Sequence, residues 1–324
     1  MHNPLVSIIS INYNQAQLTC DMVSSLQKIT YPTIEIIVID NASPSEDPQI
    51  ISDKHPHITL IRSDKNLGFS GGNNLGIKAA RGKYLLFLNN DTEVDPGFLE
   101  PLVEHFEDNP KTGIASPKII FYGTDQRIQY AGCTGINVWT GRGKIIGYLE
   151  KDLGQHNGCF NTGLIHGAAM MVSRSVIEKA GLMPELYFLY YEEHDWALMI
   201  KRAGFESHYI GTSTIYHKES MSVGKSSVLK TFYMNRNRLV FIRRNYKGKH
   251  LLASSLFFFG LALPKNIMKH MVKGDFSHAK AILKGILWNV NTKSVNQNHY
   301  LPVGTETAAR YPIDNMKNER YGSI

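Results

Sequence analysis

Three apolar segments near the start of the chain each end in asparagine or aspartate, and they limit the folds that this chain can adopt. The segments read LVSIISINYN (5–14), IEIIVIDNAS (34–43) and KYLLFLNNDT (83–92). Nearly continuous apolar runs of this length indicate parallel strands buried on both faces of a sheet. The stretch after the first strand has helical spacing, with Leu18, Met22, Leu26 and Ile29 three or four residues apart. This alternation predicts a doubly wound α/β domain.

Polar side chains end each predicted strand, at the edge of the sheet where a doubly wound domain binds its ligand. Asn12 and Asn14 follow the first strand, and Asp40 and Asn41 follow the second. Their amide and carboxylate groups supply the donors and acceptors that a base and a ribose require. The sequence therefore predicts a nucleoside site at this edge.

Residues 66–76, NLGFSGGNNLG, are predicted to form a loop that enters a helix ending near residues 81–82. Glycine lets a backbone approach a ligand closely, and a helix N-terminus favours an anion such as a diphosphate. A simple turn is the competing interpretation. The segment matches neither of the two common phosphate-loop patterns, GxxxxGK[ST] and GxGxxG.

The third strand runs into three acids, Asp91, Glu93 and Asp95. A carboxylate at a strand end can hold a hard cation together with substrate phosphates, and that cation would neutralise a leaving diphosphate. Asp91 is the candidate for this role, with a solvated strand end as the alternative. Asp95 precedes Pro96 and is predicted to cap a helix that runs to about Glu107. Glu93 stays open between an acceptor contact and solvent.

A second acidic cluster lies in YYEEHDW, residues 190–196. On a helix, Glu192 and Asp195 share a face, whereas Glu193 points elsewhere. The flanking aromatic residues indicate a partly enclosed site, where burial raises a carboxyl pKa toward the range of a general base. Compensation of the helix dipole is the alternative role for these acids.

Three residues further along the chain could contact a metal or a phosphate. His217 ends the apolar stretch YIGTSTIYH and could ligate a metal through a neutral imidazole, although a lone histidine is more often structural. Arg236 and Arg238, in YMNRNRLVFIRRNY, suit a phosphate, a diphosphate or a lipid headgroup.

Composition excludes a disordered chain and a bundle of membrane helices, because 43% of the 324 residues are apolar and 19% are charged. The three cysteines, Cys20, Cys133 and Cys159, form no CxxC pair, which favours a reducing compartment. The first ten residues contain no signal-peptide pattern. A cytoplasmic location is therefore predicted.

Charge divides the chain into two regions. Residues 218–293 contain 15 Lys and Arg against two acids, whereas residues 1–217 contain 17 basic and 23 acidic residues. A basic segment suits nucleic acid, an anionic membrane or a phosphorylated substrate. Residues 251–264 carry no charge but are shorter than the roughly 20 residues that span a bilayer, so we predict a buried or interfacial helix. We expect residues 230–290 to contact the inner face of the cell membrane, with Phe257–Phe259 entering the interface.

Seven segments in this order resemble the inverting family 2 glycosyltransferases of the GT-A fold, particularly the rhamnosyltransferase-like branch. They are VSIISINYN, IIVIDNAS, NLGFSGGNNLGI, YLLFLNNDTEVDPGFL, the stretch from GAAMMVS to KRAGF, YHKESMSVG and FYMNRNRLVFIRRNY. The resemblance covers about residues 5–245. It implies a GT-A fold with a Rossmann-like, mostly parallel central sheet and flanking helices, followed by a basic helical C-terminal region.

The resemblance also implies roles for individual residues. The residues that would bind the nucleotide sugar are Asn12, Asn14, Asp40, Asn41, Asn66, Gly68, Gly71, Asn73, Asn74, Asn90 and Asp91. Asp91 stands at the last position of the family's D-x-D motif and would contact the metal and the diphosphate, with His217 as a further metal ligand. Glu193 stands at the position of the catalytic base, and Asp195 is its rival. Independently of the resemblance, Glu192, Arg236 and Arg238 are candidate contacts to the acceptor or to a phosphate.

Three positions depart from the family pattern. Asn89 replaces the first carboxylate of D-x-D, which leaves fewer charged metal ligands. Glu193 replaces an aspartate, and its extra methylene displaces the base. Pro184 replaces an aspartate, so we assign it no role.

The predicted function is metal-dependent transfer of a sugar, with inversion, from a dTDP-, UDP- or GDP-sugar to an acceptor hydroxyl. The acceptor is expected to be a saccharide or a lipid-linked saccharide of a cell-surface polysaccharide, and the cofactor Mn²⁺ or Mg²⁺. The alternatives are a nucleotidyltransferase acting on sugar phosphates and a non-catalytic carbohydrate or membrane-surface binding protein. No nucleic acid is expected as a partner, and an oligomer is compatible with the sequence.

We expect three regions along the chain. Residues 1–225 would form the transferase domain, with a nucleotide-binding half (1–110) and an acceptor-binding half (111–225). Residues 226–293 would form a basic, amphipathic helical extension, and residues 294–324 a polar tail.

Overall fold

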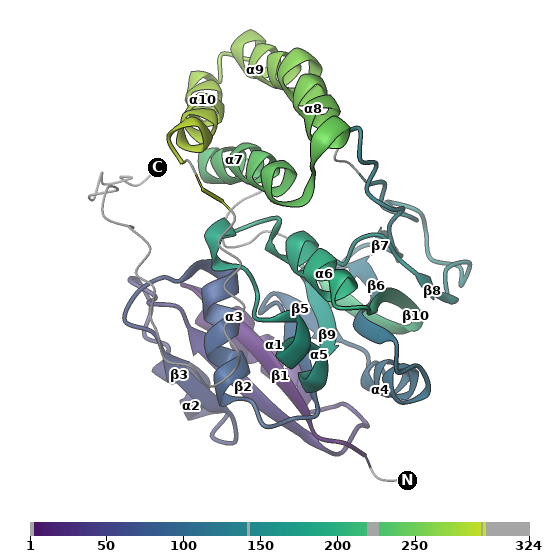
Figure 1. The fold of residues 1–324 in the computed structure, drawn as a ribbon. Helices are drawn as coiled ribbons and strands as arrows, with labels where there is room; N and C mark the ends of the chain where they lie inside the picture. Colours follow the sequence, from purple (N-terminus) through teal and green to yellow (C-terminus); the bar gives the residue numbers. More distant parts are fainter. Residues whose placement is uncertain (1–2, 141–142, 219–226, 293, 296–324) are drawn as a thin grey trace.

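A ten-stranded sheet is the centre of the molecule (Figure 1). The computed structural model describes residues 3–140, 143–218, 227–292 and 294–295. The strands are β1 (Val6–Asn12), β2 (Ile34–Asp40), β3 (Thr59–Arg62), β4 (Tyr84–Leu88), β5 (Thr92–Val94), β6 (Thr112–Phe121), β7 (Ile128–Tyr130), β8 (Cys159–Asn161), β9 (Ala169–Ser173) and β10 (Glu206–His217). Their order is β3-β2-β1-β4-β9-β6-β10-β5, with β7 paired to β6 and β8 to β10.

The first half of the sheet is parallel, as the three apolar segments predict. β1 lies between β2 and β4 and pairs in parallel with both, and β3 extends the parallel set beyond β2. The register places Asn12 opposite Asp40, so the polar residues that end β1 and β2 stand at the same level. The second half is mixed, because β9 inserts antiparallel between β4 and β6.

Two hydrophobic cores cover the two faces of the sheet. The helices of the first half are α1 (Ala16–Leu26), α2 (Gln49–Lys54), α3 (Gly68–Ala79) and α4 (Leu99–Asp108). Apolar residues of α1 and α4 join one core with Ile8 and Leu86. Ile77 of α3 joins the other core with Ile9 and Phe87. Alternate residues of β1 and β4 therefore enter opposite cores, which explains their continuous apolar sequence.

Two glycines of α3 allow it to lie close against β1. A Cβ atom at Gly76 would lie 2.3 Å from the Cγ2 atom of Ile9, and one at Gly72 would lie 2.8 Å from the Cδ1 atom of Ile11. Such distances are far inside van der Waals contact, so a side chain at either position would push the helix away from the sheet. Part of the glycine content of residues 66–76 thus has a packing cause.

Two helices from the later part of the chain join α3 in the second core, and a short 3-10 helix lies between them. These are α5 (Arg174–Ala180), the short 3-10 helix η1 (Glu185–Tyr187) and α6 (Glu192–Arg202). Residues 122–140 and 143–168 contain the short strands β7 and β8, joined by turns and bridges. Gly181 ends α5 with a φ of 89°, a conformation that favours glycine at the end of a helix.

The predicted helix cap at Asp95 is wrong. The helix begins at Leu99, and Phe98, the residue before it, makes no side-chain cap bond. The carbonyl of Asp95 accepts a bond from the Phe98 amide, and its carboxylate is hydrogen-bonded to Tyr216 instead. The chain after Pro96 makes one further turn before the helix starts, and this turn moves the cap position away from Asp95.

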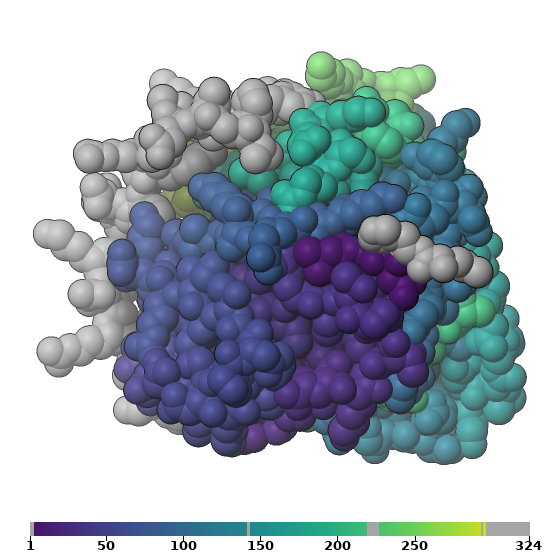
Figure 2. Space-filling model, turned by 90° about the horizontal axis from the view of Figure 1, so that it is seen from below, coloured from purple at the N-terminus to yellow at the C-terminus, as the bar shows by residue number. Residues whose placement is uncertain are grey.

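The C-terminal helices gather beyond the carboxyl edge of the sheet, at the top of Figure 1. They are α7 (Val228–Asn245), α8 (Gly248–Phe257), the π-helical turn η2 (Phe258–Ala262), α9 (Leu263–Val272) and α10 (Phe276–Asn291). The opposite side of the molecule is formed largely by residues of the N-terminal half, coloured purple to blue (Figure 2). Residues 296–324, most of the predicted polar tail, lie outside the described residues.

Helices α8 and α9 run through η2 as one 25-residue helix, Gly248–Val272, which is long and apolar enough to cross a membrane by length and composition alone. Only 17% of its most apolar stretch is buried. Phe258 and Ala262 pack against Leu239 of α7, and most of the remaining side chains face outward. A buried helix was one of our two predictions for residues 251–264, and the exposure of this helix makes that prediction wrong.

Candidate active site

A cavity of about 730 Å³ opens at the carboxyl edge of the sheet, between the strand ends, the start of α6 and one side of α7. Its size lies in the range typical of small-molecule sites, roughly 300–1,000 Å³. The predicted site residues that line it are Asn41, Asn66, Gly68, Asn73, Asn90, Asp91, Glu192, Glu193 and His217. Those that do not line it are Asn12, Asn14, Asp40, Gly71, Asn74, Asp195, Arg236 and Arg238. The fold thus brings about half of the predicted residues into one cavity and places the others behind the residues that line it.

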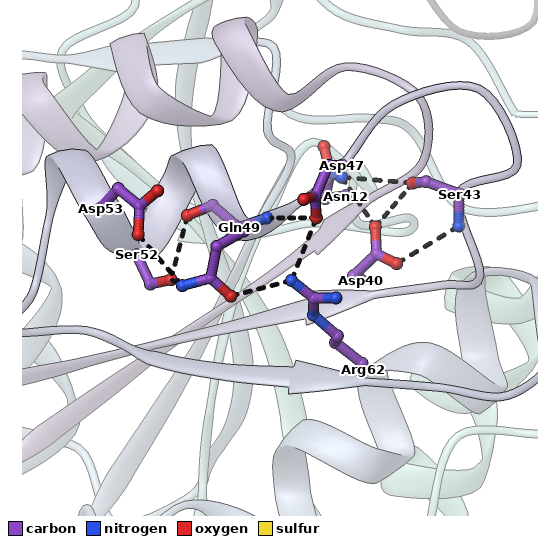
Figure 3. Close-up of polar contacts among 8 residues, drawn as sticks. All are labelled: Asn12, Asp40, Ser43, Asp47, Gln49, Ser52, Asp53 and Arg62. Atoms are coloured by element: carbon purple, nitrogen blue, oxygen red, sulfur yellow. Dashed lines mark hydrogen bonds and ion pairs between the residues drawn. The ribbon is translucent and has the colours of Figure 1, made fainter.

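Asn12 and Asp40 form a buried polar network beside this cavity (Figure 3). The side-chain amide of Asn12 donates to Oδ1 of Asp40 at 2.9 Å, and the Ser43 hydroxyl donates to the same oxygen at 2.6 Å. The Ser43 amide donates to Oδ2 at 3.2 Å. The carboxylate is therefore held in one orientation, next to Tyr13 and Asn41, which line the cavity.

The loop after β2 is fastened at its outer end by Arg62 (Figure 3). The guanidinium of Arg62 donates to Oδ1 of Asp47 at 3.1 Å and to Oε1 of Gln49 at 2.9 Å. Nearer the cavity, Asn14 has a φ of 55°, and its side-chain oxygen accepts a bond from the Ser45 amide. The exposed Arg62 pair contributes little stability, so the order of this loop depends mainly on the buried network around Asp40.

Asn41 fastens the start of α3 to the end of β2. The side-chain nitrogen of Asn41 donates to Oδ1 of Asn66 at 3.0 Å and to the Gly68 carbonyl at 3.1 Å. Its side-chain oxygen accepts from the Leu67 amide at 2.9 Å. Gly68 has a φ of +70°, and a Cβ atom there would lie 2.2 Å from the carbonyl oxygen of Phe188. Glycine is needed here because the two halves of the domain meet backbone to backbone.

The predicted loop over residues 66–76 is mostly helix, because α3 already begins at Gly68. Consequently its polar residues point in different directions. Asn73 lines the cavity, and its buried side-chain nitrogen has no hydrogen-bond partner among the described residues. Asn74 bonds to the backbone of Met183 in both directions and to Glu185. Gly71 lies against Leu67 rather than against the cavity.

Asp91 and His217 meet at the floor of the cavity. The antiparallel pairing of β5 with β10 sets His217 opposite Thr92, the residue after Asp91. Oδ1 of Asp91 lies 3.1 Å from Nε2 of His217, and both side chains are buried. Nδ1 of His217 is 2.8 Å from Oε1 of Gln129. Two residues 126 positions apart in the sequence thus form the pair that the sequence analysis assigned to a metal.

This pair has the chemistry of a partial metal site. The oxygen of Gln129 can only accept, so Nδ1 of His217 donates to it, and Nε2 is the ring nitrogen that faces Asp91. That buried nitrogen makes no hydrogen bond although it faces a carboxylate oxygen. A divalent cation is suited to such a carboxylate and imidazole pair. Among the described residues no group of three or more His, Cys, Asp or Glu could hold a metal ion, so further ligands would have to come from a bound diphosphate.

Glu192 and Glu193 begin α6 and both line the cavity. We expected Glu193 to point away from Glu192, but the first helical turn abuts the cavity, so consecutive residues reach it. Burial, and then the neighbouring Glu193, raise the pKa of Glu192 well above its ordinary value. Glu192 therefore keeps its proton to a higher pH than an exposed glutamate does. The carboxyl group of Glu193 lies beside Gly167 on the opposite wall.

Asp195 faces away from the cavity. It is fully buried, and its carboxylate accepts from Nε of Arg244 and from the side-chain nitrogen of Asn245, at 2.7 and 2.8 Å. Both partners belong to the end of α7. One turn of helix is enough to direct Asp195 to α7 while Glu192 faces the cavity, although the two residues share the buried side of α6.

Arg236 and Arg238 also lie behind the cavity. Arg236 donates to the carbonyls of Leu186 and Tyr187, and Arg238 donates to the carbonyl of Thr140. Both side chains are buried. A phosphate contact by these arginines stays a prediction, and their observed bonds to carbonyls argue against it.

His166 lines the cavity but was not predicted. It precedes β9, and its ring centre lies 6.0 Å from that of His217. Burial lowers the pKa of His166 to about 3, so the ring is neutral. The antiparallel pairing of β9 with β4 brings the start of β9 to the end of β4. Sequence analysis missed His166 because an apolar run does not reveal the direction in which its strand enters a sheet.

Comparison with known proteins agrees with this arrangement. The sequence model of the family described as "Glycosyl transferase family 2" matches residues 7–181. The chain is 30% identical over 204 residues to the low-salt glycan biosynthesis hexosyltransferase Agl10 of Haloferax volcanii, which covers 61% of this chain and 62% of that protein. It is 20% identical over 265 residues to the N-acetylglucosaminyl-diphospho-decaprenol L-rhamnosyltransferase of Mycobacterium tuberculosis, covering 75% and 86%. An uncharacterised protein of Sinorhizobium fredii is longer, and the chain spans 31% of it.

The fold is similar to that of solved glycosyltransferases. The mannosyltransferase PcManGT of Pyrobaculum calidifontis, solved in complex with GDP-Man and Mn²⁺, superposes with a TM-score of 0.55 at 14% identity. The match covers 91% of this chain and 89% of that one. The GT-A fold predicted from the sequence is therefore confirmed.

Replacing Glu192 with glutamine should make stability less dependent on pH. Above the ordinary pKa of 4.5 the unfolded chain releases this proton while the folded chain keeps it, so wild-type stability falls with rising pH. The loss is about 1.4 kcal/mol per pH unit until the folded pKa is reached. We expect the stability of Glu192→Gln, measured by urea denaturation, to exceed that of the wild type increasingly as the pH rises above 4.5. The exposed substitution Glu178→Gln is the control, and equal pH profiles for all three proteins would contradict the raised pKa of Glu192.

Proposed function

Since the chain belongs to glycosyl transferase family 2, we propose that it transfers a sugar from a nucleotide-diphosphate sugar to an acceptor hydroxyl with inversion. The observation that carries this proposal is that Asp91, at the end of the nucleotide half, and Glu193, at the start of α6, line the same cavity. Asp91 is suited to hold a cation that binds the leaving diphosphate, and Glu193 is suited to take the proton of the attacking hydroxyl. A single displacement between them needs no covalent enzyme intermediate.

The donor would extend along the strand ends. Asp40 and Asn12 are buried acceptors and donors beside Tyr13, and they would orient the base and the ribose. Asn41, Asn66 and Asn73 line the cavity next to them and would contact the sugar phosphate. We propose a dTDP-, UDP- or GDP-sugar as the donor, and the GDP-Man complex of PcManGT is consistent with this class.

A divalent cation, Mn²⁺ or Mg²⁺, is the proposed cofactor, and Asp91 and His217 are its proposed protein ligands. It would neutralise the charge that develops on the diphosphate. Gln129 fixes the ring of His217 through Nδ1 and leaves Nε2 free for this role. The position of the first carboxylate of the family motif is Asn89, so the protein would supply one carboxylate to the cation.

Glu193 is the proposed base that removes the acceptor proton. It lines the cavity, whereas both oxygens of Asp195 are held by Arg244 and Asn245. Asp195 is therefore the less favourable choice. Burial raises the pKa of Glu192 beside it, and in its protonated form this carboxyl group can donate a hydrogen bond to a sugar oxygen.

The proposed acceptor is a saccharide or a lipid-linked saccharide of a cell-surface polysaccharide. The wall of the cavity farther from the nucleotide half is apolar and includes Ile136, Ile145 and Leu164. Tyr130, Tyr190 and Tyr191 add aromatic rings that can stack on sugars. A lipid-linked substrate is named for the relative from M. tuberculosis.

We also propose that the 25-residue helix Gly248–Val272 lies along the inner face of a membrane. Its exposed apolar side chains include Leu252, Leu256, Phe259, Leu261, Met268, Met271 and Val272. Lysines at positions 265, 269 and 273 accompany them, and Asp275 is the only acid in residues 227–292. One side of the helix packs on α7 through Phe258, so an interfacial position fits better than a membrane span. The enzyme itself would be cytoplasmic.

The other candidate functions have less support. A nucleotidyltransferase does not agree with membership of a glycosyltransferase family, and the strand end INYNQAQ contains no Gly, Lys or Arg. A non-catalytic binding protein would not require both Asp91 and Glu193 in the cavity. Nucleic-acid binding is not proposed. Residues 1–217 carry more acidic than basic residues, and the basic residues 218–293 include the apolar helix Gly248–Val272, so a lipid surface suits this segment better.

Donor binding should depend on a metal and on Asp91. We expect one or more UDP-, GDP- or dTDP-sugars to raise the melting temperature with Mn²⁺ or Mg²⁺, since a ligand at 100 times its Kd adds about 2.7 kcal/mol to stability. Asp91→Ala should fold normally, lose this metal-dependent increase and lose transfer activity. Asp64→Ala, at an exposed position after β3, is the matched control. Absence of any shift with the whole donor panel would contradict the proposed function.

Replacing Glu193 with glutamine should remove catalysis and retain donor binding. Loss of a general base costs about 10²- to 10⁴-fold in kcat. Transfer or donor hydrolysis gives kcat, and calorimetry gives the donor Kd. Asp195→Asn is the comparison, and we expect it to lower the melting temperature because it weakens the buried pair with Arg244. Full turnover by Glu193→Gln, with loss of turnover in a stable Asp195→Asn, would assign the base to Asp195.

Membrane binding should require both anionic lipid and the exposed apolar side chains. In co-sedimentation, we expect the protein to pellet with phosphatidylglycerol-containing vesicles and to stay in the supernatant with pure phosphatidylcholine vesicles. The double substitution Phe259→Asp and Leu261→Asp should abolish pelleting. Leu153→Asp, at an exposed position outside the C-terminal helices, is the control. Equal recovery in the supernatant with both vesicles would contradict the proposal.

A further inference from the structure

The loop that delivers Glu192 and Glu193 to the cavity has an unusual backbone. Phe188, Tyr190 and Tyr191 have φ angles of 64°, 70° and 77°, in the left-handed region that non-glycine residues seldom adopt. None of the three is a glycine, the residue that adopts this conformation without strain. Such a cluster of strained residues needs surrounding contacts that hold it, and it is typical of functional sites.

Helix α7 supplies most of those contacts through two adjacent side chains. Nη2 of Arg236 donates to the Leu186 carbonyl at 2.8 Å, and Nη1 donates to the Tyr187 carbonyl at 3.1 Å. The side-chain nitrogen of Asn237 lies 3.0, 2.7 and 2.8 Å from the carbonyls of Tyr187, Leu189 and Tyr190. An amide nitrogen has two hydrogens, so three carbonyls share them.

The remaining carbonyls of this loop are also bonded. The Phe188 carbonyl accepts from the Phe69 amide at 2.7 Å, and the Tyr191 carbonyl accepts from the Asp195 amide at 3.0 Å. All six carbonyls from Leu186 to Tyr191 therefore have partners, and two residues of α7 supply four of them. Within the loop itself, the Leu189 amide donates to the Tyr187 carbonyl at 2.8 Å, and the left-handed residues interrupt a regular hydrogen-bond pattern.

The two side chains are themselves held rigidly. Asn237 is fully buried, and the guanidinium of Arg236 lies 3.9 Å from the ring centre of Trp288 in α10. Nη1 of Arg236 also donates to Oδ1 of Asn237 at 2.8 Å, which fixes the amide so that its nitrogen faces the loop. The C-terminal end of α7 also binds α6, the helix that begins with Glu192 and Glu193. Arg244 and Asn245 of α7 donate to the carboxylate of Asp195.

We propose that Arg236 and Asn237 are positioning residues for the transfer reaction, holding the strained 186–191 loop so that Glu192 and Glu193 project into the cavity. The inference rests on the proposed function and adds a role for α7 that the sequence did not indicate. Charge alone suggested a phosphate contact for Arg236. Its bonds to carbonyls assign it to the loop instead.

The test compares two asparagines of the same helix in the full-length protein. Asn237→Leu preserves volume and removes the donor to three carbonyls. Asn235→Leu is the matched control, because Asn235 is also buried but, within the described part of the chain, its side chain bonds only to the Thr231 carbonyl of α7. Hydrolysis and transfer with UDP-GlcNAc, GDP-mannose and dTDP-rhamnose would give kcat and KM. Hydrogen exchange would report on the amides of residues 186–195.

We expect Asn237→Leu to lower kcat at least tenfold, with the donor Kd within about threefold of wild type, since an ordered base is needed for turnover rather than donor binding. Exchange should accelerate in residues 186–195 in this variant and remain at the wild-type rate in Asn235→Leu. Arg236→Gln removes one of the two residues that donate to the loop. Its kcat and its exchange rate in residues 186–195 should therefore lie between those of the wild type and Asn237→Leu. This second variant applies the same criteria if Asn237→Leu does not fold.

Three results would overturn the inference. One is wild-type kcat in a folded Asn237→Leu, and another is equal loss in Asn235→Leu. The third is a raised donor Kd with unchanged kcat in Arg236→Gln, which would return Arg236 to a phosphate contact. Failure of the proposed function is distinguishable, because the wild type itself would then turn over none of the three donors. The exchange measurement would still decide whether α7 orders the loop.

Discussion

The parallel pairing of β1 with β2 and β4 is the constraint on which the site depends. Both faces of these strands are buried, so a shift of one residue would exchange the side chains of the two cores. The register is therefore unique, and it sets Asn12 level with Asp40. All the polar residues at these strand ends consequently reach the same edge of the sheet, where a ligand can contact them together.

A second constraint joins this edge of the sheet to α6, the helix that carries Glu192 and Glu193. The backbone of Gly68 approaches the carbonyl of Phe188 so closely that no side chain fits between them. The Phe69 amide bonds to that carbonyl, while Arg236 and Asn237 hold the loop from its other side. The strained loop thus lies between α3 and α7. Its acids occupy the cavity because both neighbours are in place, and the C-terminal helices belong to the architecture of the site.

Sequence analysis predicted the parts of this protein that depend on local pattern. The strands β1, β2 and β4 and the polar edge of the sheet follow from apolar runs and end signals. Residue types at strand ends identified Asp91 and His217, and the resemblance assigned Glu193. The start of α3 at Gly68 was missed because its first turns are rich in turn-forming residues. The glycines at positions 72 and 76 instead allow close packing against β1.

The fold class, the edge of the sheet that carries the site and the kinds of side chain gathered there could be predicted from the sequence, because they depend on periodicity and on strand ends. The folded chain was needed to show which acid faces the cavity, that Asp91 meets His217, and that Arg236 contacts carbonyls. These depend on the direction of strands and the rotation of helices, which contacts between distant residues determine. Asp195 illustrates the reason. It lies one helical turn from Glu192 on the same buried side of α6, and a partner some 50 residues away, Arg244, holds its carboxylate away from the cavity.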